Sequence, residues 1–378
     1  MRRVAVVHDW LVSDAGSERV LEQILSCYPE ADVFSLIDCL SGEERAFLNG
    51  RKVQTSFLQS LPLKRRLYQK CLPLMPAAIE HLDLRDYSLI LTSSSAISKG
   101  ILTTPEQLHV CYLQSRSLRY GYDERFFYAA RGLLGPVQEM IMSRARVWDY
   151  VASHRPDHTI ANSEFVRRWH QHRYGIESTV IYPPVDLALF GGELRDAKAD
   201  YYVLVSRFEK YKQVPLVIEA FNQLGLPLVI IGGGSQEKAI RRMAKPNIRS
   251  LGVLPPREVA KVVADARASI YAGREDFGIA LVEAQAAGTP VIAFSDGAAK
   301  EIVRGLTDPS PTGVLFGAQT VEAVKEGVKE FEKNRARIQG SACSENSLRF
   351  SRNRFRQEFK AFVEDRWAQF AAEMPKRT

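Results

Sequence analysis

The chain has 378 residues, of which 46% are hydrophobic and 25% charged, the composition of an ordinary globular protein. Its length favours two domains over one. The net charge of +7 and the pI near 9.1 suit an acidic partner such as nucleic acid, anionic lipid or a phosphorylated ligand. The sequence has no zinc-finger spacing, RNP-like aromatic run or basic heptad, so we expect no nucleic acid partner.

The cysteine pattern and the N-terminal run bear on the cellular compartment. The five cysteines are odd in number and scattered, with no C-x-x-C pair, which argues against a disulfide framework or a structural zinc site. The run MRRVAVVHDW is basic but only briefly apolar, which is typical of a first strand rather than a signal peptide. No run approaches the roughly 20 apolar residues that span a bilayer. We expect a cytoplasmic protein, or one peripheral on the inner face of the cell membrane.

Apolar strands alternate with helical patterns in the first half of the chain, which predicts an α/β domain with a parallel sheet. Asn162 and Ser163 precede the helical run EFVRRWHQHR and supply its cap. The stretch 182–200 contains two prolines and two glycines without clear periodicity, so we expect it to connect two domains. The predicted strands of this half cover 4–7, 31–36, 88–91, 110–113, 158–161 and 179–181.

The second half repeats the alternation and predicts a second doubly wound, parallel-sheet domain. The segment 350–370 places Phe355, Phe359, Phe362 and Val363 at i, i+4, i+7 and i+8, which predicts a long amphipathic helix. The predicted strands cover 202–205, 228–231, 269–271, 291–294 and 314–316, and the predicted helices between them cover 212–223, 236–244, 256–265 and 319–332.

The run EDFGIALVEAQAAGTPVIAF, which starts at Glu275, predicts a ligand site. It follows an apolar strand, and a glycine and a helix start come directly after the acid. A loop at the carboxyl end of a parallel strand is where open α/β sheets bind ligands, and the next helix points N–H groups into that loop. Glu275 can accept hydroxyls while the helix start holds an anion, which suits a sugar attached to a diphosphate. Alternatively, the spacing of Glu275 and Glu283 arises by chance in a helical protein.

Two cations follow the strand predicted at 202–205. Arg207 and Lys212 lie in one loop before the next helix. An Arg grips phosphate oxygens bidentately and a Lys adds a point charge, so this loop suits a leaving diphosphate. The alternative is a solvated basic loop.

Taken together, these segments resemble a retaining glycosyltransferase of family 4, and its mannosyltransferase-like branch in particular. The likeness covers nearly the whole chain through HDW…AGSERVLEQI, SSSAISKG, IANSEFVRR…TVIYPPVD, SRFEKYKQVPLVIEAF, VIIGGGS, EDFGIALVEAQAAGTPVIAF, TGVLF and FSRNRFRQEF. It implies the GT-B fold, in which two Rossmann-like domains face a cleft and a C-terminal helix returns to the N-domain. The acceptor-binding domain would cover 1–185, the nucleotide-sugar-binding domain 186–345 and the returning helix 346–378.

The resemblance also implies roles for matching residues. Arg207 and Lys212 would neutralise the donor diphosphate, and Glu275 would contact hydroxyls of the donor sugar, so these three are the implied catalytic residues. Glu283 would bind the ribose hydroxyls. The other implied donor-binding positions are Gly16 at the first helix start, Gly233 in a glycine triplet that a tight turn would also explain, Leu254 near the base, and the N–H groups of Phe277, Gly278 and Ile279.

The N-domain departs from the family pattern at one position. Family members often have a His after the strand that here ends VCYLQSRS, and Gln114 takes its place. The other candidates for this side of the site are His8 and Asp9, at the end of the first strand. Gln114 could hydrogen-bond a sugar hydroxyl, signal altered acceptor chemistry or mark an inactive enzyme.

The implied reaction is a metal-independent transfer of a hexose with retention of configuration, with no cofactor besides the donor substrate. We favour mannose from GDP-mannose as the donor, and a lipid-linked or growing glycan in polysaccharide biosynthesis as the acceptor. The sequence has no D-x-D between strands of the kind that metal-dependent sugar transferases use. A non-catalytic nucleotide-sugar-binding or scaffold member, and an epimerase on the same fold, remain as alternatives.

The segment 61–75 is a candidate membrane contact. It places Lys64, Arg65, Arg66 and Lys70 among leucines and a tyrosine, a pattern that suits the surface of an anionic membrane. The alternative is an ordinary helix that packs its apolar side inward.

Overall fold

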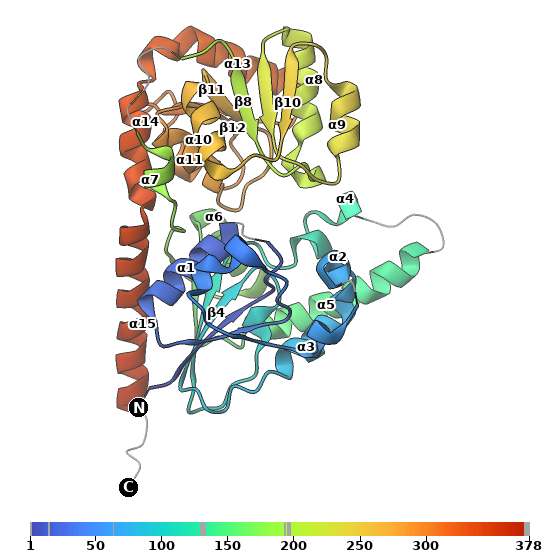
Figure 1. Ribbon diagram of the computed structural model, residues 1–378, viewed down its shortest axis with the longest axis vertical. Coiled ribbons are helices and arrows are strands. Elements are labelled where there is room, and N and C mark those ends of the chain that lie inside the picture. The colour runs from blue at the N-terminus through green and yellow to red at the C-terminus, as the bar shows by residue number, and fades with distance from the viewer. Residues whose placement is uncertain are drawn as a thin grey trace. The chain divides into compact units, whose positions relative to one another are not determined.

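The computed structural model describes residues 2–13, 16–62, 64–128, 134–192, 194 and 198–373, and it divides into two compact α/β units (Figure 1). Unit 1 comprises Met1–Pro184 with Asn353–Thr378, and unit 2 comprises Val185–Arg352. The division predicted after 185 lies next to the observed one. The division predicted after 345 falls inside unit 2, because Phe350 places its ring 5.5 Å from that of Phe277 and so fixes this stretch to unit 2.

Unit 1 is built on one parallel sheet with strand order β3-β2-β1-β4-β5-β6-β7 among the described residues. Val4 and Val6 of the central strand β1 enter one core cluster, while Ala5 and Val7 enter another. Because successive side chains of a strand point to opposite faces, both faces of this sheet are covered. The strands are β1 (Val4–His8), β2 (Asp32–Ser35), β3 (Val53–Thr55), β4 (Leu89–Ser94), β5 (Leu108–Leu113), β6 (His158–Ala161) and β7 (Thr179–Val180).

The C-terminal helix α15 (Arg352–Glu373) packs into the core of unit 1, as predicted. Phe355, Phe359 and Val363 are buried at i, i+4 and i+8. The rings of Phe355 and Phe359 lie 5.6 and 6.3 Å from the ring of Tyr112 on β5. The other α-helices of unit 1 are α1 (Gly16–Cys27), α2 (Lys64–Leu67), α3 (Met75–Glu80), α4 (Arg125–Tyr128), α5 (Leu134–Ser153) and α6 (Glu164–Tyr174).

Unit 2 contains the second parallel sheet, in the order β10-β9-β8-β11-β12-β13 among the described residues. Its strands are β8 (Tyr202–Val205), β9 (Leu228–Ile231), β10 (Ile248–Gly252), β11 (Ala268–Tyr271), β12 (Val291–Phe294) and β13 (Gly313–Phe316). Its α-helices are α7 (Leu187–Phe190), α8 (Val214–Leu224), α9 (Glu237–Met243), α10 (Pro256–Asp265), α11 (Ile279–Ala286), α12 (Ala299–Ile302), α13 (Val321–Asn334) and α14 (Gly340–Ser347).

Each sheet reverses its strand order at one point. In unit 1 the reversal lies between β1 and β4, and in unit 2 it lies between β8 and β11. Ligands of open α/β sheets bind at the carboxyl ends of the strands that flank such a reversal. The loops after these four strands are therefore the places to look for functional side chains.

Three local features differ from the sequence prediction. The edge strands β3 and β10 are not predicted, because VQT and IRSLG lack an apolar run. The stretch 182–200 does more than connect domains, since Asp186 caps α7 inside unit 2 by accepting from the N–H of Leu189. Helix α8 begins at Val214 because Gln213 has a left-handed φ of 55°, which ends the preceding 3-10 turn.

Candidate active site

The reversal point of unit 2 brings Lys212 and Glu275 together. Lys212 follows β8 and Glu275 follows β11, and these two strands are hydrogen-bonded neighbours. The Lys212 Nζ donates to Glu275 Oε1 at 2.9 Å and to Oε2 at 2.7 Å. Burial lowers the pKa of Lys212, but the charge of Glu275 and the hydrogen bond to it raise that pKa above its ordinary value. Lys212 is therefore positively charged at neutral pH, and its hydrogen bonds to Glu275 fix the position of its ammonium group.

Tyr211 links the two cations of the loop after β8. Arg207 is exposed and donates from Nη2 to the hydroxyl oxygen of Tyr211 at 2.7 Å. The Nζ of Lys212 lies 5.2 Å from the centre of the same ring, within the range of a cation–π contact. The structure thus brings together Arg207, Lys212 and Glu275. Tyr211 is not among the residues predicted from the sequence, although its place between two lysines in EKYK is a usable signal.

Two glycines hold the backbone around Glu275 in a conformation that other residues rarely adopt. Gly278 caps α11 with a φ of 101°. Gly297 has a φ of 107°, and a Cβ there would lie 2.6 Å from the carbonyl oxygen of Glu275. That same oxygen accepts from the N–H of Ala298 at 2.9 Å. The close approach of the Gly297 backbone therefore fixes the backbone position of Glu275.

Helix α11 supplies the remaining predicted groups of this loop. Ile279 is its first residue, so the N–H groups of the first turn point toward the loop. Phe277, which precedes the helix, is buried, and Glu283 within the helix is almost fully buried. Burial raises the pKa of Tyr271 and a bond with Ser269 opposes this, while the charges of Glu283 and Glu275 add to the rise. The negative charges of Glu283 and Glu275 therefore both raise the pKa of Tyr271 on β11.

The glycine triplet 232–234 is hydrogen-bonded to the loop that contains Arg207. Gly233 accepts from the N–H of Phe208 at 2.8 Å. The Glu209 carboxylate accepts from the N–H of Ser235 at 3.1 Å and from its hydroxyl at 2.7 Å. A Cβ on Gly233 would lie 3.3 Å from Val253, so the triplet also borders the loop of the half-buried Leu254. Glu209 is a positioning residue that the sequence analysis missed.

The reversal point of unit 1 contains a chain of polar contacts from Gln114 to Glu18. Gln114 Nε2 donates to Ser93 Oγ at 2.9 Å and to the carbonyl oxygen of Ser17 at 3.4 Å. Ser93 Oγ lies 3.0 Å from His8 Nδ1, and His8 Nε2 lies 3.7 Å from Glu18 Oε1. Burial raises the pKa of Glu18, but the contacts with His8 and Ser17 lower it, and the net direction is down.

The partners in this chain determine the orientation of the Gln114 amide. A carbonyl oxygen can only accept, so the NH₂ group of Gln114 must face Ser17. Ser93 then accepts from Gln114 and can give its own hydrogen to His8 Nδ1, which fixes the imidazole tautomer by its partners. The Oε1 of Gln114 is left as the acceptor that the side chain can offer to a ligand hydroxyl. Gly16 starts α1 beside Ser17, as predicted.

Asp9 supports a loop. Its Oδ2 accepts from the N–H groups of Ser95 and Ala96, both at 2.7 Å. Its Oδ1 accepts from those of Ile97 at 3.1 Å and Ser98 at 2.6 Å. Asp9 is 1% exposed, so we assign it to holding the turn after β4 and not to contacting a substrate.

Asn in place of Asp9 is expected to destabilise unit 1 by about 1–3 kcal/mol, because an NH₂ group would then face backbone donors and leave them unsatisfied. The check is the urea midpoint followed by tryptophan fluorescence. An unchanged midpoint would contradict the structural role. As a control, Asp83→Asn should change the midpoint little, because Asp83 pairs with Arg85 at the surface.

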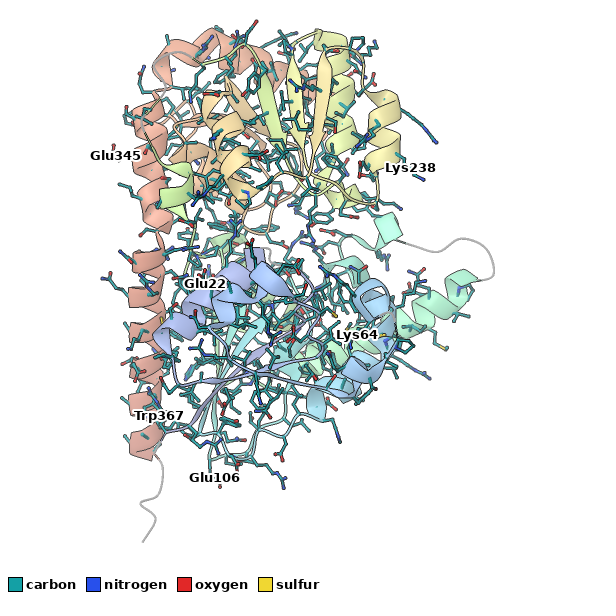
Figure 2. The ribbon with its side chains drawn as sticks, in the orientation of Figure 1. Glu22, Lys64, Glu106, Lys238, Glu345 and Trp367 are labelled. Carbon is teal, nitrogen blue, oxygen red and sulfur yellow. The ribbon has the colours of Figure 1, made fainter. Side chains whose placement is uncertain are left out.

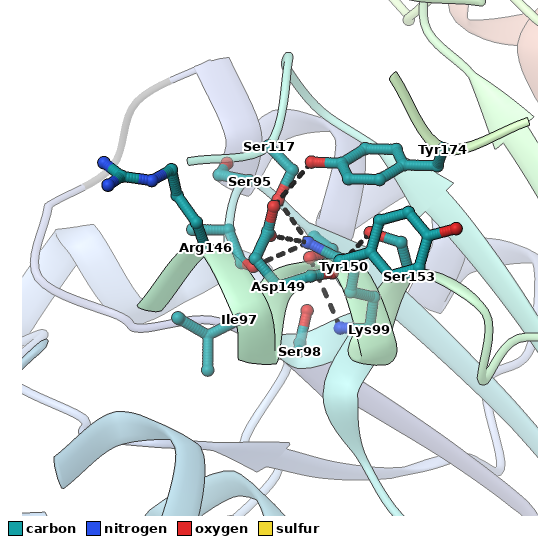
Figure 3. A network of polar contacts seen from close by, with 12 residues as sticks. Ser95, Ile97, Ser98, Lys99, Ser117, Arg146, Asp149, Tyr150, Ser153 and Tyr174 are labelled. Carbon is teal, nitrogen blue, oxygen red and sulfur yellow. Dashed lines mark hydrogen bonds and ion pairs between the residues drawn. The ribbon is translucent and has the colours of Figure 1, made fainter. Parts of the chain in front are cut away.

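A buried ion pair lies beneath the loop that follows Gln114 (Figure 3). The Nζ of Lys99 donates to Asp149 Oδ1 at 2.6 Å, and the hydroxyl of Ser117 donates to the same oxygen at 2.8 Å. The hydroxyl of Tyr174 donates to Asp149 Oδ2 at 2.5 Å. Burial raises the pKa of Asp149, but the charge of Lys99 and these hydrogen bonds lower it overall. The network ties α5 to the loop at Ser117.

The segment 61–75 packs most of its apolar side inward. Leu61, Tyr68 and Leu72 pack against a core cluster of unit 1, which also contains the buried Met75. Lys64 on α2, which is labelled in Figure 2, donates to the carbonyl oxygen of Gln59 at 2.6 Å. Leu63 and the side chains of Arg66 and Leu67 lie outside the described residues. The ordinary packing alternative therefore accounts for these apolar positions.

Two family models match consecutive parts of the chain. Residues 15–189 match the model described as Glycosyltransferase Family 4, and residues 188–350 match the model described as Glycosyl transferases group 1. The two matches join end to end over both units. The chain belongs to glycosyltransferase family 4.

Curated relatives of this family 4 glycosyltransferase include two mannosyltransferases. It is 26% identical over 190 residues to the phosphatidyl-myo-inositol mannosyltransferase of Mycobacterium tuberculosis, a match that covers 46% of each chain. It is 23% identical over 253 residues to O-antigen chain mannosyltransferase C of Escherichia coli, which covers 61% of each. The matched region thus spans about half the length of the mycobacterial relative and under two thirds of the other.

A solved structure shows the same fold. The Anabaena protein Alr3699/HepE, in complex with UDP and glucose, has a TM-score of 0.70 and 17% identity over 96% of this chain and 100% of its own. This likeness establishes the GT-B fold for the family 4 glycosyltransferase. Among the described residues no helix combines the length and apolarity needed to cross a bilayer.

Proposed function

We propose that this chain is a retaining glycosyltransferase that moves a hexose from a nucleotide sugar to a glycan acceptor. The observation that supports this most directly is the Lys212–Glu275 pair beside Arg207 at the reversal point of unit 2. It offers cations for a diphosphate and a carboxylate for sugar hydroxyls within one loop cluster. Family membership and the names of the curated relatives support the same class of reaction.

The proposed chemistry breaks the bond from the anomeric carbon to the diphosphate oxygen and forms a bond to the acceptor oxygen on the same face. The proton of the acceptor hydroxyl goes to the departing diphosphate. Negative charge grows on that diphosphate, so Arg207, Lys212 and the N-terminus of α11 would stabilise the transition state without a metal ion. Glu275 would hold the sugar hydroxyls and Glu283 the ribose hydroxyls.

We propose mannose from GDP-mannose as the donor and a lipid-linked or growing glycan in polysaccharide biosynthesis as the acceptor. The two curated relatives described above are mannosyltransferases by name. On the acceptor side, the orientation of Gln114 leaves its Oε1 to accept from a hydroxyl, which is compatible with a sugar. A lipid-linked acceptor would be met at a membrane, so we propose that the enzyme works in the cytoplasm at the inner face of the cell membrane.

The first experiment is a panel of GDP-mannose, UDP-glucose, UDP-N-acetylglucosamine and UDP-galactose, assayed for transfer and slow hydrolysis with and without EDTA. We expect GDP-mannose to turn over, EDTA to leave the rate unchanged, and Glu275→Ala to abolish turnover. A rate that falls with EDTA and returns with added divalent metal would overturn the metal-independent mechanism.

The alternative, a non-catalytic nucleotide-sugar-binding or scaffold member, is motivated by Gln114 in place of the usual His. The same panel separates the two. Donor binding without turnover, even with lipid-linked acceptors supplied, would favour the scaffold. Gain of turnover in Gln114→His would then identify this position as the cause.

A further inference from the structure

Helix α5 of unit 1 exposes an apolar stripe. Val137, Met140, Val147 and Val151 are each at least half exposed. With Arg144 they lie at i, i+3, i+7, i+10 and i+14, so they share one face of the helix over about 21 Å. In Figure 1 the amino-terminal half of α5 extends past α2 and α3.

A different face of α5 anchors the helix to unit 1. Asp149 and Ala152 are fully buried, and the indole Nε1 of Trp148 donates to Glu80 Oε1 at 2.8 Å. The exposed stripe is therefore distinct from the face through which α5 packs onto the core of unit 1. The helix has one apolar face directed inward and a second one directed to solvent, which an isolated soluble domain does not need.

Cations accompany the stripe, and the exposed acid described on α5 lies off it. Arg144 is exposed within it. The 3-10 helix η3 (Tyr68–Leu74) packs beside α5 and presents the exposed Lys70 and Leu74. The segment 61–75 contains no Asp or Glu. Glu139 of α5 lies off the stripe and pairs with Arg146.

We propose that the stripe of α5, with Arg144 in it and Lys70 on the neighbouring η3, lies on an anionic bilayer surface. An interfacial helix buries one apolar face at the headgroup boundary and places cations against anionic lipid, which matches this arrangement. A second copy of the chain fits less well. The stripe is one side chain wide, whereas a stable dimer buries roughly 800 Å² per partner, and two copies would bring like charges together. The inference rests on the proposed function, since a lipid-linked acceptor is reached at a bilayer.

The test is co-sedimentation of the full chain with phosphatidylcholine vesicles, with and without phosphatidylglycerol, at low and high salt. We expect the variant V137Q/M140Q/V147Q/V151Q to bind anionic vesicles at least about tenfold more weakly. Arg144→Glu with Lys70→Glu should remove the dependence on phosphatidylglycerol and on salt. The control L102Q/L348Q, which changes two exposed leucines outside α5, should bind as the wild type does.

Equal vesicle binding by the wild type and the quadruple variant would overturn the inference. So would a wild-type dimer that the quadruple variant converts to monomer, because the stripe would then join two copies. Transfer to a water-soluble acceptor separates this inference from the proposed function. Transfer without vesicle binding defeats only the membrane surface, and vesicle binding without transfer to any acceptor defeats only the enzyme.

Discussion

Alanine in place of Lys212 is expected to lower kcat by about 30- to 1,000-fold, or about 2–4 kcal/mol of transition-state stabilisation. The ammonium group lies within 2.9 Å of both Glu275 oxygens, which fixes its position before a donor arrives. Charge on the diphosphate grows as the anomeric bond breaks, so a preorganised cation acts mainly on kcat and less on KM. Steady-state kinetics at saturating acceptor measure both constants.

Two comparisons make this prediction specific to charge at the site. Lys210→Ala removes an exposed lysine from the same loop and should leave kcat within about twofold. Lys212→Ala also leaves Glu275 without its cation, so thermal unfolding must show that the variant is folded. Arg207→Ala should lower kcat similarly at little cost in stability, because Arg207 is exposed. Normal turnover in Lys212→Ala would refute the diphosphate role.

Methionine in place of Lys99 is expected to destabilise unit 1 by about 3–5 kcal/mol, because it leaves the buried carboxylate of Asp149 without its positive partner. The two side chains are 1% and 0% exposed, so water cannot replace the lost charge. All four tryptophans, Trp10, Trp148, Trp169 and Trp367, belong to unit 1. Urea unfolding followed by tryptophan fluorescence therefore reports the stability of this unit separately from unit 2.

A double-mutant cycle separates the ion pair from loss of packing. Lys99→Met with Asp149→Asn removes both charges and should recover part of the loss, since no uncompensated charge then remains buried. Arg85→Met breaks an exposed pair with Asp83, also in unit 1, and should change the urea midpoint little. A Lys99→Met variant as stable as this surface control would contradict the buried pair.

The sequence predicts the strands best where an apolar run has clear ends. The predicted strands at 158–161 and 202–205 coincide with β6 and β8. The carboxyl ends of β8 and β11 also identify the loops of Arg207 and Glu275 in advance. What the sequence cannot supply is strand order, because pairing depends on contacts between distant segments. The meeting of Lys212 with Glu275 follows from the β8–β11 neighbourhood, which only the fold reveals.

The side chains that orient others are the hardest to predict. Ser93 connects His8 with Gln114 over a sequence distance that no local pattern spans. Asp9 was expected beside a substrate, yet four backbone N–H groups occupy its oxygens. The apolar pattern of 61–75 predicts amphipathicity but not which neighbour covers it, whereas the exposed stripe on α5 becomes evident only when its buried face is known.

The placement of α15 has a consequence for synthesis on the ribosome. The core of unit 1 needs Phe355, Phe359 and Val363, which are translated after the whole of Val185–Arg352. Unit 2 is contiguous in sequence and can complete its core as soon as Arg352 has emerged. Unit 1, although its first strand is made at the start, must wait for the last helix. Nascent chains halted before Asn353 should therefore protect unit 2 from protease sooner than unit 1.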